Sequence, residues 1–401
     1  MDMTHALDLD ASAVGFHPFS RDDTLNYQAN RWLHDDPQAL EDFRTAAPSS
    51  TDLGDWTAMY LSLAKRVRDQ GREMEAAFFA RGAEFFMTPA DPRKTPVREQ
   101  FVSTVHRAFA LAPEPVPFGT GALPAYELVD PDAQGALREG AHNGPRSTWV
   151  VFGGFDSYIE ELFPALAAVA QRGRRVIAFE GPGQGGALED HGLTMSADWA
   201  APVSAVLDHF GIEEATAFGL SLGGGLVMHA AAGEPRIKRV VACDVLDDFL
   251  EVLVSQSLPP TPARIAGRTL ARIEPLIAHV PGGMLNRVLA ARSRRSLMAW
   301  WGMWQGMHVT GTHSPAAFLR AAAAFSTADV SPRVTGDVLL MQGAEDEFVP
   351  LHQMVRQAER LTAARSVTTR TFTRAETAAS HCQTGNPGLV ARTILAWEEG
   401  L

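Results

Sequence analysis

The chain has 401 residues, 46% of them hydrophobic, which is enough for a large buried core with an appended piece. A formal net charge of −12 argues against a partner with a nucleic-acid phosphate backbone. The chain has two cysteines, Cys243 and Cys382, which exclude a disulfide framework and fit a reducing cytoplasm. We find neither a signal-peptide pattern nor an apolar stretch long enough to span a membrane. We therefore expect a cytoplasmic protein without a membrane partner.

The first part of the chain predicts helices without strands between them. Apolar residues recur at helical spacing in residues 22–35, 52–87 and 96–112. Most of the phenylalanines in the second stretch are expected in the helix core. We predict an N-terminal helical domain over residues 1–115.

Strands and helices alternate from there on, which is typical of an α/β fold with a mostly parallel central sheet. This sheet core is expected over residues 116–245 and 331–401. Short apolar strands are predicted at 147–154, 174–181, 214–220, 237–244, 336–343 and 366–373. Residues 246–330 show helical patterns and no strand, so we predict a helical lid insertion over the carboxyl ends of the strands.

A serine stands between glycines where the strand at 214–220 turns into a helix. Gly219, Ser221 and Gly223 form the pattern G-x-S-x-G. In a turn this tight the central residue is strained, and its hydroxyl is exposed above the sheet. The pattern favours Ser221 as a nucleophile over a turn without chemistry, provided that a base and an acid follow in the chain.

Both partners follow in the order serine, aspartate, histidine that α/β-hydrolases share. Asp346 comes just after the strand at 336–343, and His381 lies between the last strand and the terminal helix. We predict the catalytic triad Ser221, Asp346 and His381. The competing acid is Glu345; the competing bases His308, His313 and His352 do not follow the last strand, and we place them in the lid or at the surface.

Two backbone amides are expected to stabilise an oxyanion beside the serine. The N–H of Leu222 follows the nucleophile, and the N–H of Phe155 lies in the turn after the strand at 147–154. In the same turn we interpret Ser157 and Glu160 as a helix-capping pair and Asp156 as structural.

The predicted lid contains a stretch rich in tryptophan and methionine. Such a stripe is most often core, but in a lid it also suits the wall of a pocket for a flat apolar ligand. The pocket candidates are Trp300, Trp301, Met303, Trp304 and Met307. We find no metal-ligand spacing and no dinucleotide motif, so we expect no metal and no cofactor.

Five motifs together resemble the FrsA-like α/β-hydrolases, which include fungal polyketide-shortening hydrolases of the yellowish-green type and bacterial 2,6-dihydroxypseudooxynicotine hydrolase. They are GGFDS, FEGPGQG, GLSLGGG, GAEDEFVP and SHCQTGN, and the resemblance covers roughly residues 16–400. It implies an α/β-hydrolase fold roofed by the N-terminal helices and the lid, the same triad, and a homodimer. It also implies an extra acidic residue near the substrate, for which the candidates are Glu180, Asp244, Asp247 and Glu251; for each we prefer a capping or salt-bridged role.

The leading functional hypothesis is a serine hydrolase that cleaves a C–C bond beside the carbonyl of an aromatic or polyketide-like ketone. The alternatives are a carboxylesterase for an apolar ester and a non-hydrolytic elimination or acyl-transfer enzyme of natural-product biosynthesis. A catalytically silent binding protein on the same fold is a further class, which an intact triad disfavours.

Overall fold

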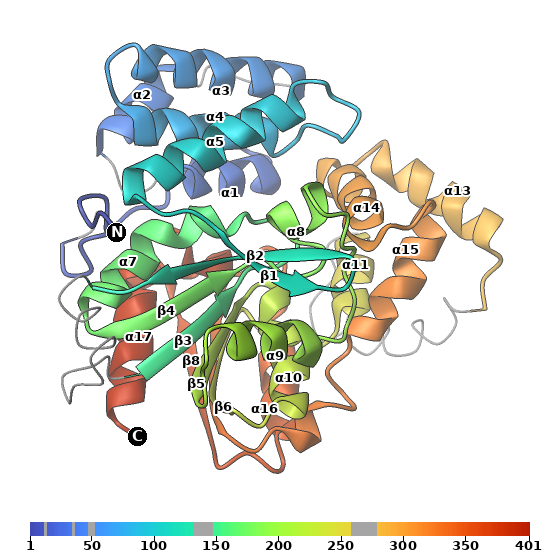
Figure 1. Ribbon diagram of the computed structural model, residues 1–401. Helices are drawn as coiled ribbons and strands as arrows, with labels where there is room; N and C mark the ends of the chain where they lie inside the picture. Colours follow the sequence, from blue (N-terminus) through green and yellow to red (C-terminus); the bar gives the residue numbers. More distant parts are fainter. Residues whose placement is uncertain (12–13, 34–36, 47–52, 131–146, 258–278) are drawn as a thin grey trace.

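The computed structural model describes residues 1–11, 14–33, 37–46, 53–130, 147–257 and 279–401 (Figure 1). The predicted lid is therefore described only in part, and so is the end of the predicted helix at 22–35. Among the described residues, no helix combines the length and the apolar character needed to cross a membrane.

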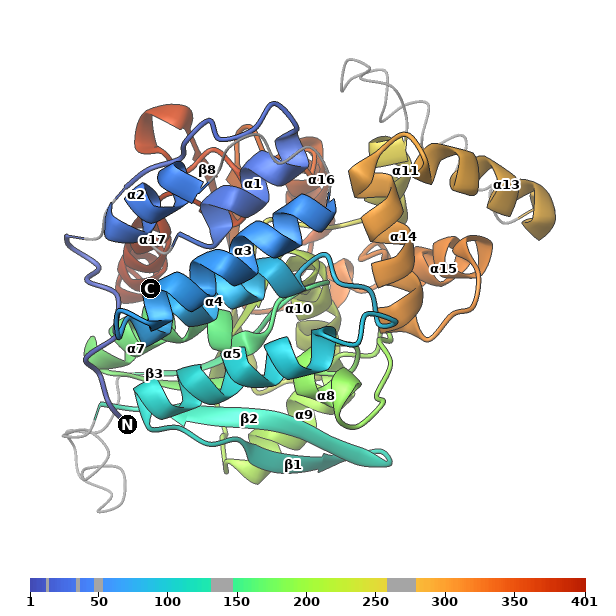
Figure 2. The same ribbon diagram turned by 90° about the horizontal axis from the view of Figure 1, so that it is seen from above.

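In the described part of the chain, five helices precede the sheet, and they lie together on one side of it (Figures 1 and 2). They are α1 (Asp23–Arg31), α2 (Pro37–Ala46), α3 (Leu53–Arg68), α4 (Glu73–Glu84) and α5 (Lys94–Phe109). The apolar pattern at 52–87 forms two helices rather than one, because Gly71 between them has a positive φ of 81° that ends α3 and reverses the chain.

The central sheet has eight strands in the order β1-β2-β4-β3-β5-β6-β7-β8. The hairpin of the first two strands is antiparallel and joins β4 antiparallel, while all later neighbours pair parallel. The strands are β1 (Glu114–Phe118), β2 (Gly121–Leu128), β3 (Ser147–Phe152), β4 (Arg174–Phe179), β5 (Ala215–Leu220), β6 (Ile237–Cys243), β7 (Asp337–Gly343) and β8 (Ser366–Phe372). The predicted fold class is confirmed.

Helices cover both faces of this sheet, and strand alternation divides the core between them. Trp149, Val151 and Phe218 pack on the face that carries α7 (Phe163–Gln171), α17 (Pro387–Glu399) and the N-terminal helices. Val150 and Phe152 pack on the opposite face. That face carries α9 (Ala200–His209), α10 (Leu222–Gly233) and α16 (His352–Arg360), and the short α8 (Gly185–Glu189) follows β4.

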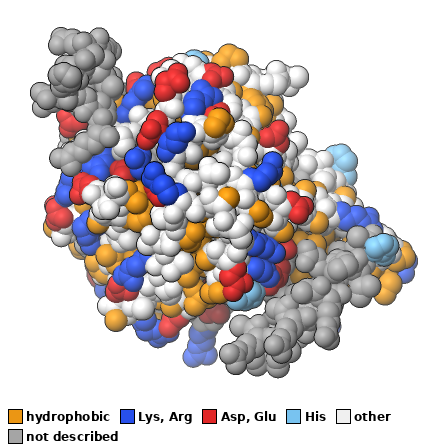
Figure 3. All heavy atoms as spheres, turned by 90° about the horizontal axis from the view of Figure 1, so that it is seen from below, with side chains coloured by type: hydrophobic (Ala, Val, Ile, Leu, Met, Phe, Trp, Pro, Cys, Tyr) orange, Lys and Arg blue, Asp and Glu red, His pale blue; other side chains and the backbone are white. Residues whose placement is uncertain are grey.

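The segment between β6 and β7 is helical in its described part. It forms α11 (Phe249–Ser257), α13 (Gly282–Ser293), α14 (Leu297–Thr310) and α15 (Pro315–Ala322), which lie beside the N-terminal helices in Figure 2. The exact domain boundaries at 115, 245 and 330 stay a prediction. On the face shown in Figure 3, basic and acidic side chains are interspersed, with no continuous patch of one sign.

Candidate active site

Ser221 occupies a strained turn between β5 and α10. Its backbone has φ 60° and ψ −123°, a conformation that a non-glycine residue rarely adopts. The flanking glycines make this turn possible. A methyl group at Gly219 would lie 2.0 Å from the carbonyl oxygen of Gly223, and one at Gly223 would lie 2.5 Å from the oxygen of Gly153. The turn leaves the half-buried Ser221 facing a cavity.

The structure brings Ser221, His381 and Asp346 into one hydrogen-bonded chain. Nε2 of His381 lies 2.9 Å from Oγ of Ser221, and Nδ1 of His381 lies 2.8 Å from Oδ2 of Asp346. His381 follows the last strand in a short 3-10 turn (His381–Gln383) and is 6% exposed. This is the geometry in which an imidazole can accept the serine proton while a carboxylate fixes its tautomer.

Asp346 is itself fixed by its surroundings. Oδ1 accepts hydrogen bonds from the backbone N–H groups of Phe348 and Val349, both at 2.8 Å. The side-chain amide of Gln342 donates to Oδ2, also at 2.8 Å. These three hydrogen bonds hold the carboxylate in the position from which it contacts the imidazole.

A second carboxylate reaches the same imidazole. Oδ2 of Asp244 lies 3.2 Å from Nδ1 of His381, and Asp244 is fully buried at the end of β6. It accepts hydrogen bonds from the backbone N–H of Cys382 and, at 2.8 Å, from the side-chain amide of Gln383. Burial, together with the charge of Asp346, raises the pKa of Asp244 to about 7. Asp244 is thus the one candidate extra carboxylate that touches the triad.

The pKa of His381 is well above its usual value. Burial alone disfavours the imidazolium, but the charges of Asp346 and Asp244 outweigh it. Two aromatic rings enclose the imidazole edge-on: Tyr27 of α1, with ring centroids 5.9 Å apart, and Phe348, at 5.0 Å. The N-terminal helices therefore contribute directly to the enclosure of the histidine.

The two residues predicted to supply the oxyanion amides line the same cavity. Leu222 is the first residue of α10, so its N–H has no acceptor within the helix. Phe155 lies in the loop that follows β3, and both residues line the cavity at Ser221. The loop packs tightly there, since a methyl group at Gly154 would lie 2.9 Å from the nitrogen of Leu222. Ser157 bonds the N–H of Gly154 at 3.3 Å, which stabilises the loop.

The predicted capping pair of Ser157 and Glu160 is wrong, because a different carboxylate caps this turn. The carboxylate that reaches back to the start of the helical turn is that of Glu161, which accepts from the N–H of Tyr158 at 3.0 Å. Glu160 instead accepts a hydrogen bond from the hydroxyl of Tyr126 at 2.7 Å. The turn begins one residue later than the spacing from Ser157 suggests.

A cavity of about 300 Å³ lies over Ser221 and is mostly apolar. Of the predicted pocket residues, Trp301 and Met303 line it. Trp300, Trp304 and Met307 do not line it, so the prediction is wrong for these three residues. All three are half-buried. Met303 lies on the same side of α14 as they do and still lines the cavity, so helical spacing alone does not separate the lining residues from the others. Trp300 and Trp304 contact each other, with ring centroids 6.0 Å apart.

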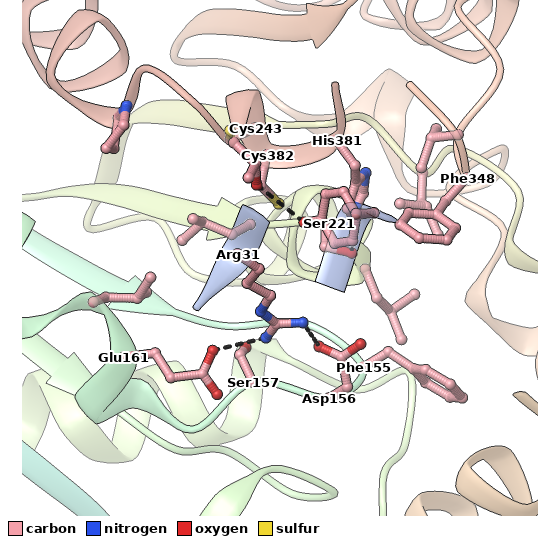
Figure 4. Close-up of a pocket in the computed structure, with 18 of the residues that line it drawn as sticks. Arg31, Phe155, Asp156, Ser157, Glu161, Ser221, Cys243, Phe348, His381 and Cys382 are labelled. Atoms are coloured by element: carbon pink, nitrogen blue, oxygen red, sulfur yellow. Dashed lines mark hydrogen bonds and ion pairs between the residues drawn. The ribbon is translucent and has the colours of Figure 1, made fainter. Parts of the chain in front are cut away.

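An arginine of the first helix also lines the cavity, and no motif in the sequence points to it. The guanidinium of Arg31 bridges Oδ1 of Asp156 at 3.1 Å and Oε2 of Glu161 at 2.7 Å (Figure 4). Arg81 of α4 bonds the other oxygen of Glu161 at 2.8 Å and the carbonyl of Asp156 at 2.6 Å. These ion pairs join the N-terminal helices to the loop that carries Phe155, so Asp156 has the structural role that we expected.

The other candidate carboxylates have structural partners. Glu180 accepts from the N–H groups of Ile159 at 3.1 Å and Gly186 at 2.5 Å, and burial beside the charge of Glu160 raises its pKa to about 8. Asp247 bonds the guanidinium groups of Arg356 and Arg360. Glu251 pairs with His352 at 2.5 Å and also with Arg356.

The competing acid and bases lie away from Ser221. Glu345 forms an exposed ion pair with Arg374 at 2.6 Å. His308 pairs with Glu189 at 2.9 Å, and His313 is exposed. Among the described residues, one group could hold a metal: Asp244, His381 and Cys382 have ligand atoms within 4.8 Å of one another. Because Nδ1 of His381 already faces two carboxylates, this group suits proton sharing better, and the absence of a metal stays a prediction.

Comparison with known proteins gives a family and several relatives. The model of the alpha/beta hydrolase fold matches residues 151–381. The chain is 29% identical over 277 residues to hydrolase acrC of Aspergillus aculeatus, covering 63% of this chain and 62% of that protein. It is 31% identical over 262 residues to 20-hydroxy-prefusarin hydrolase FUS2 of Gibberella moniliformis, covering 62% and 59%. The matches thus span about three-fifths of these two relatives.

Two solved structures share the fold over most of their length. The crystal structure of 2,6-dihydroxy-pseudo-oxynicotine hydrolase has a TM-score of 0.59 and 18% identity, covering 91% of this chain and 94% of that one. Wild-type AbyA5 has a TM-score of 0.63 and 17% identity, covering 94% and 95%. At these identities the likeness extends to the fold, including the N-terminal helical part, and not to the substrate.

Proposed function

The chain belongs to the alpha/beta hydrolase fold family, and from this premise we propose that it is a serine hydrolase that cleaves a C–C bond beside the carbonyl of an aromatic or polyketide-like ketone. The observation that carries the proposal is the hydrogen-bonded chain from Ser221 through His381 to Asp346, with distances of 2.9 and 2.8 Å. This chain opens on a mostly apolar cavity, which suits an apolar or aromatic substrate.

The first step is attack on the ketone. Oγ of Ser221 forms a bond to the carbonyl carbon while Nε2 of His381 takes the hydroxyl proton. The carbonyl electron pair moves to oxygen, and the N–H groups of Leu222 and Phe155 stabilise that oxyanion. The raised pKa of His381 supports this step, because the neighbouring carboxylates stabilise the imidazolium that forms.

The second step breaks the C–C bond. The oxyanion collapses, the bond to the neighbouring carbon breaks, and His381 gives its proton to that carbon. The leaving carbon therefore has to be a stabilised carbanion, such as an enolate or a phenol ring position. Water then attacks the ester formed on Ser221, with His381 again as base, and releases a carboxylic acid.

Two alternatives use the same residues. An ester begins with the same attack on a carbonyl, so a carboxylesterase differs only in the leaving group. Elimination or acyl transfer follows if the roofed cavity keeps water from the intermediate. The name of the relative FUS2, a prefusarin hydrolase, favours hydrolysis. A third possibility, a catalytically silent binding protein, would have the same cavity but no reactive serine.

Substrate panels separate these functions. We expect the protein to convert β-diketones or acyl phenols into a carboxylic acid and the shortened ketone or phenol, as followed by mass spectrometry. Turnover of simple esters alone would reject C–C cleavage in favour of the esterase. The further expectations of a homodimer and a cytoplasmic location rest on the resemblance and the composition; light scattering on the purified protein tests the first.

A further inference from the structure

The residues that line the cavity at Ser221 come from two parts of the fold, and only one of these parts is the lid. Phe155, Trp301 and Phe249 line the part beneath the lid helices. A second part runs between the sheet, α7 and α17, and we call it the inner arm. Six apolar residues line the inner arm: Trp149, Leu166, Val169, Phe218, Val390 and Ile394. In Figure 4, Cys243 and Phe348 lie on opposite sides of Ser221.

The inner arm is deep. Phe218 stands three residues before Ser221 on β5, and Trp149 pairs with Thr216, five residues before it. A strand rises about 3.3 Å per residue, so the arm reaches roughly 10 to 16 Å below the serine. Leu7 lines the cavity as well, and its N–H bonds the carbonyl of Pro164 at 2.8 Å. The N-terminal segment thus lies against the arm at α7.

The walls of the inner arm carry almost no polar groups. The six lining residues are between 1% and 8% exposed. The indole N–H of Trp149 bonds Glu398 at 3.1 Å and is not available to a ligand. A water molecule needs two or more polar partners to be stable in such a space, and these walls offer none. A hydrocarbon chain needs none.

We propose that the inner arm binds an extended hydrocarbon chain of the substrate, attached to the carbonyl that Ser221 attacks. This inference rests on the proposed function, and it adds a substrate class: an elongated molecule with an apolar tail on one side of the reactive carbonyl. The polar part of the cavity, where Arg31 and Asp156 lie, is left for the oxygenated portion of the molecule.

Binding of methyl ketones tests the inner arm without any chemistry. The series runs from an ethyl to an octyl chain, and it is titrated by calorimetry into the Ser221→Ala protein, which cannot react. We expect affinity to rise with chain length by up to about fourfold per methylene. Equal affinity across the series would overturn the proposal.

Matched substitutions locate the chain. Ala391→Phe on α17 and Ala165→Phe on α7 add a ring to the cavity wall, and each is expected to lower the affinity for the longest ketone about tenfold or more. Ala396→Phe, on the exposed side of α17, is the control and should keep the full dependence on chain length. Because the two variants are on different helices, a folding defect in one of them would not explain a loss of affinity in both. If neither changes the affinity, the chain does not bind here.

A separate reaction keeps the two proposals distinguishable. A methylphosphonate with a p-nitrophenyl leaving group carries no long chain, so its reaction with Ser221 of the wild-type protein does not depend on the inner arm. Labelling without chain-length dependence in the ketone series overturns the inner arm only. Chain-length dependence without labelling overturns the catalytic proposal only.

Discussion

Asp244 and Asp346 approach the same nitrogen of His381, at 3.2 and 2.8 Å. They come from the ends of neighbouring strands, β6 and β7, and both are buried. Two carboxylates this close cannot both ionise freely, which agrees with the raised pKa of Asp244, about 7. The imidazole of His381 and the carboxyl group of Asp244 therefore titrate as one coupled unit rather than independently.

The pH profile of activity tests this unit. The negative charge of Asp244 helps to raise the pKa of His381, so Asp244→Asn should lower that pKa. The histidine then stays in its base form to lower pH, and the acid limb of kcat/KM moves to lower pH. We expect a loss of about tenfold or less in kcat at the optimum, against about 10³-fold or more for Asp346→Asn. An acid limb that moves upward, or not at all, would contradict the coupling.

The ion pair between Arg31 and Glu161 should stabilise the junction of the N-terminal helices with the loop of Phe155. Both side chains are largely buried, with 15% and 7% exposed. Arg31→Met takes the ion-pair partner from Asp156 and leaves Glu161 with Arg81, so it should lower the free energy of unfolding by about 2 kcal/mol. Denaturant titration measures this. Lys65→Met breaks an exposed pair with Asp69 and should change stability by less than about 1 kcal/mol.

The turn at the serine should tolerate no side chain at position 219. Gly219→Ala places a methyl group 2.0 Å from a backbone oxygen and should lower the free energy of unfolding by about 3 kcal/mol or more. A methyl group at Gly283, in helix α13, meets nothing within 4 Å. Gly283→Ala should leave stability unchanged or raise it by up to about 1 kcal/mol. Similar melting temperatures for the two variants would refute the steric argument.

Neighbouring tryptophans of the lid should differ in their effect on substrate binding. Trp301 lines the cavity and stacks on Phe85, with ring centroids 4.9 Å apart and planes 20° apart. Trp301→Ala should raise KM about tenfold with a smaller change in kcat, since it removes contact in both ground and transition states. Trp300 is outside the cavity wall, so Trp300→Ala is the control. Equal effects on KM would show that the cavity wall is misassigned.

The sequence predicted the parts of the site that depend on local pattern and chain order. The glycines around Ser221 mark a turn that no other residue type allows, and the positions of Asp346 and His381 follow from the strands before them. Contacts between segments that are distant in the chain could not be predicted from the sequence. Nothing in α1 indicates that Tyr27 encloses His381 or that Arg31 bonds Asp156, because these depend on how the N-terminal helices pack on the sheet core.

The sequence also did not indicate which residues of the lid face the cavity. Helix α14 has apolar residues on all sides, so its pattern indicates burial without indicating which side faces the cavity. Trp301 and Trp304 were therefore equivalent in the sequence. Asp244 was a candidate among four carboxylates with similar positions at strand ends, and only its contact with His381 distinguishes it.

Labelling by a p-nitrophenyl methylphosphonate, followed by intact mass and peptide mapping, tests the central claim that Ser221 is a nucleophile. We expect one adduct per wild-type chain, located on Ser221, and none on a folded Ser221→Ala protein. A folded wild-type protein that takes up no label, or an adduct that persists after Ser221→Ala, would contradict it.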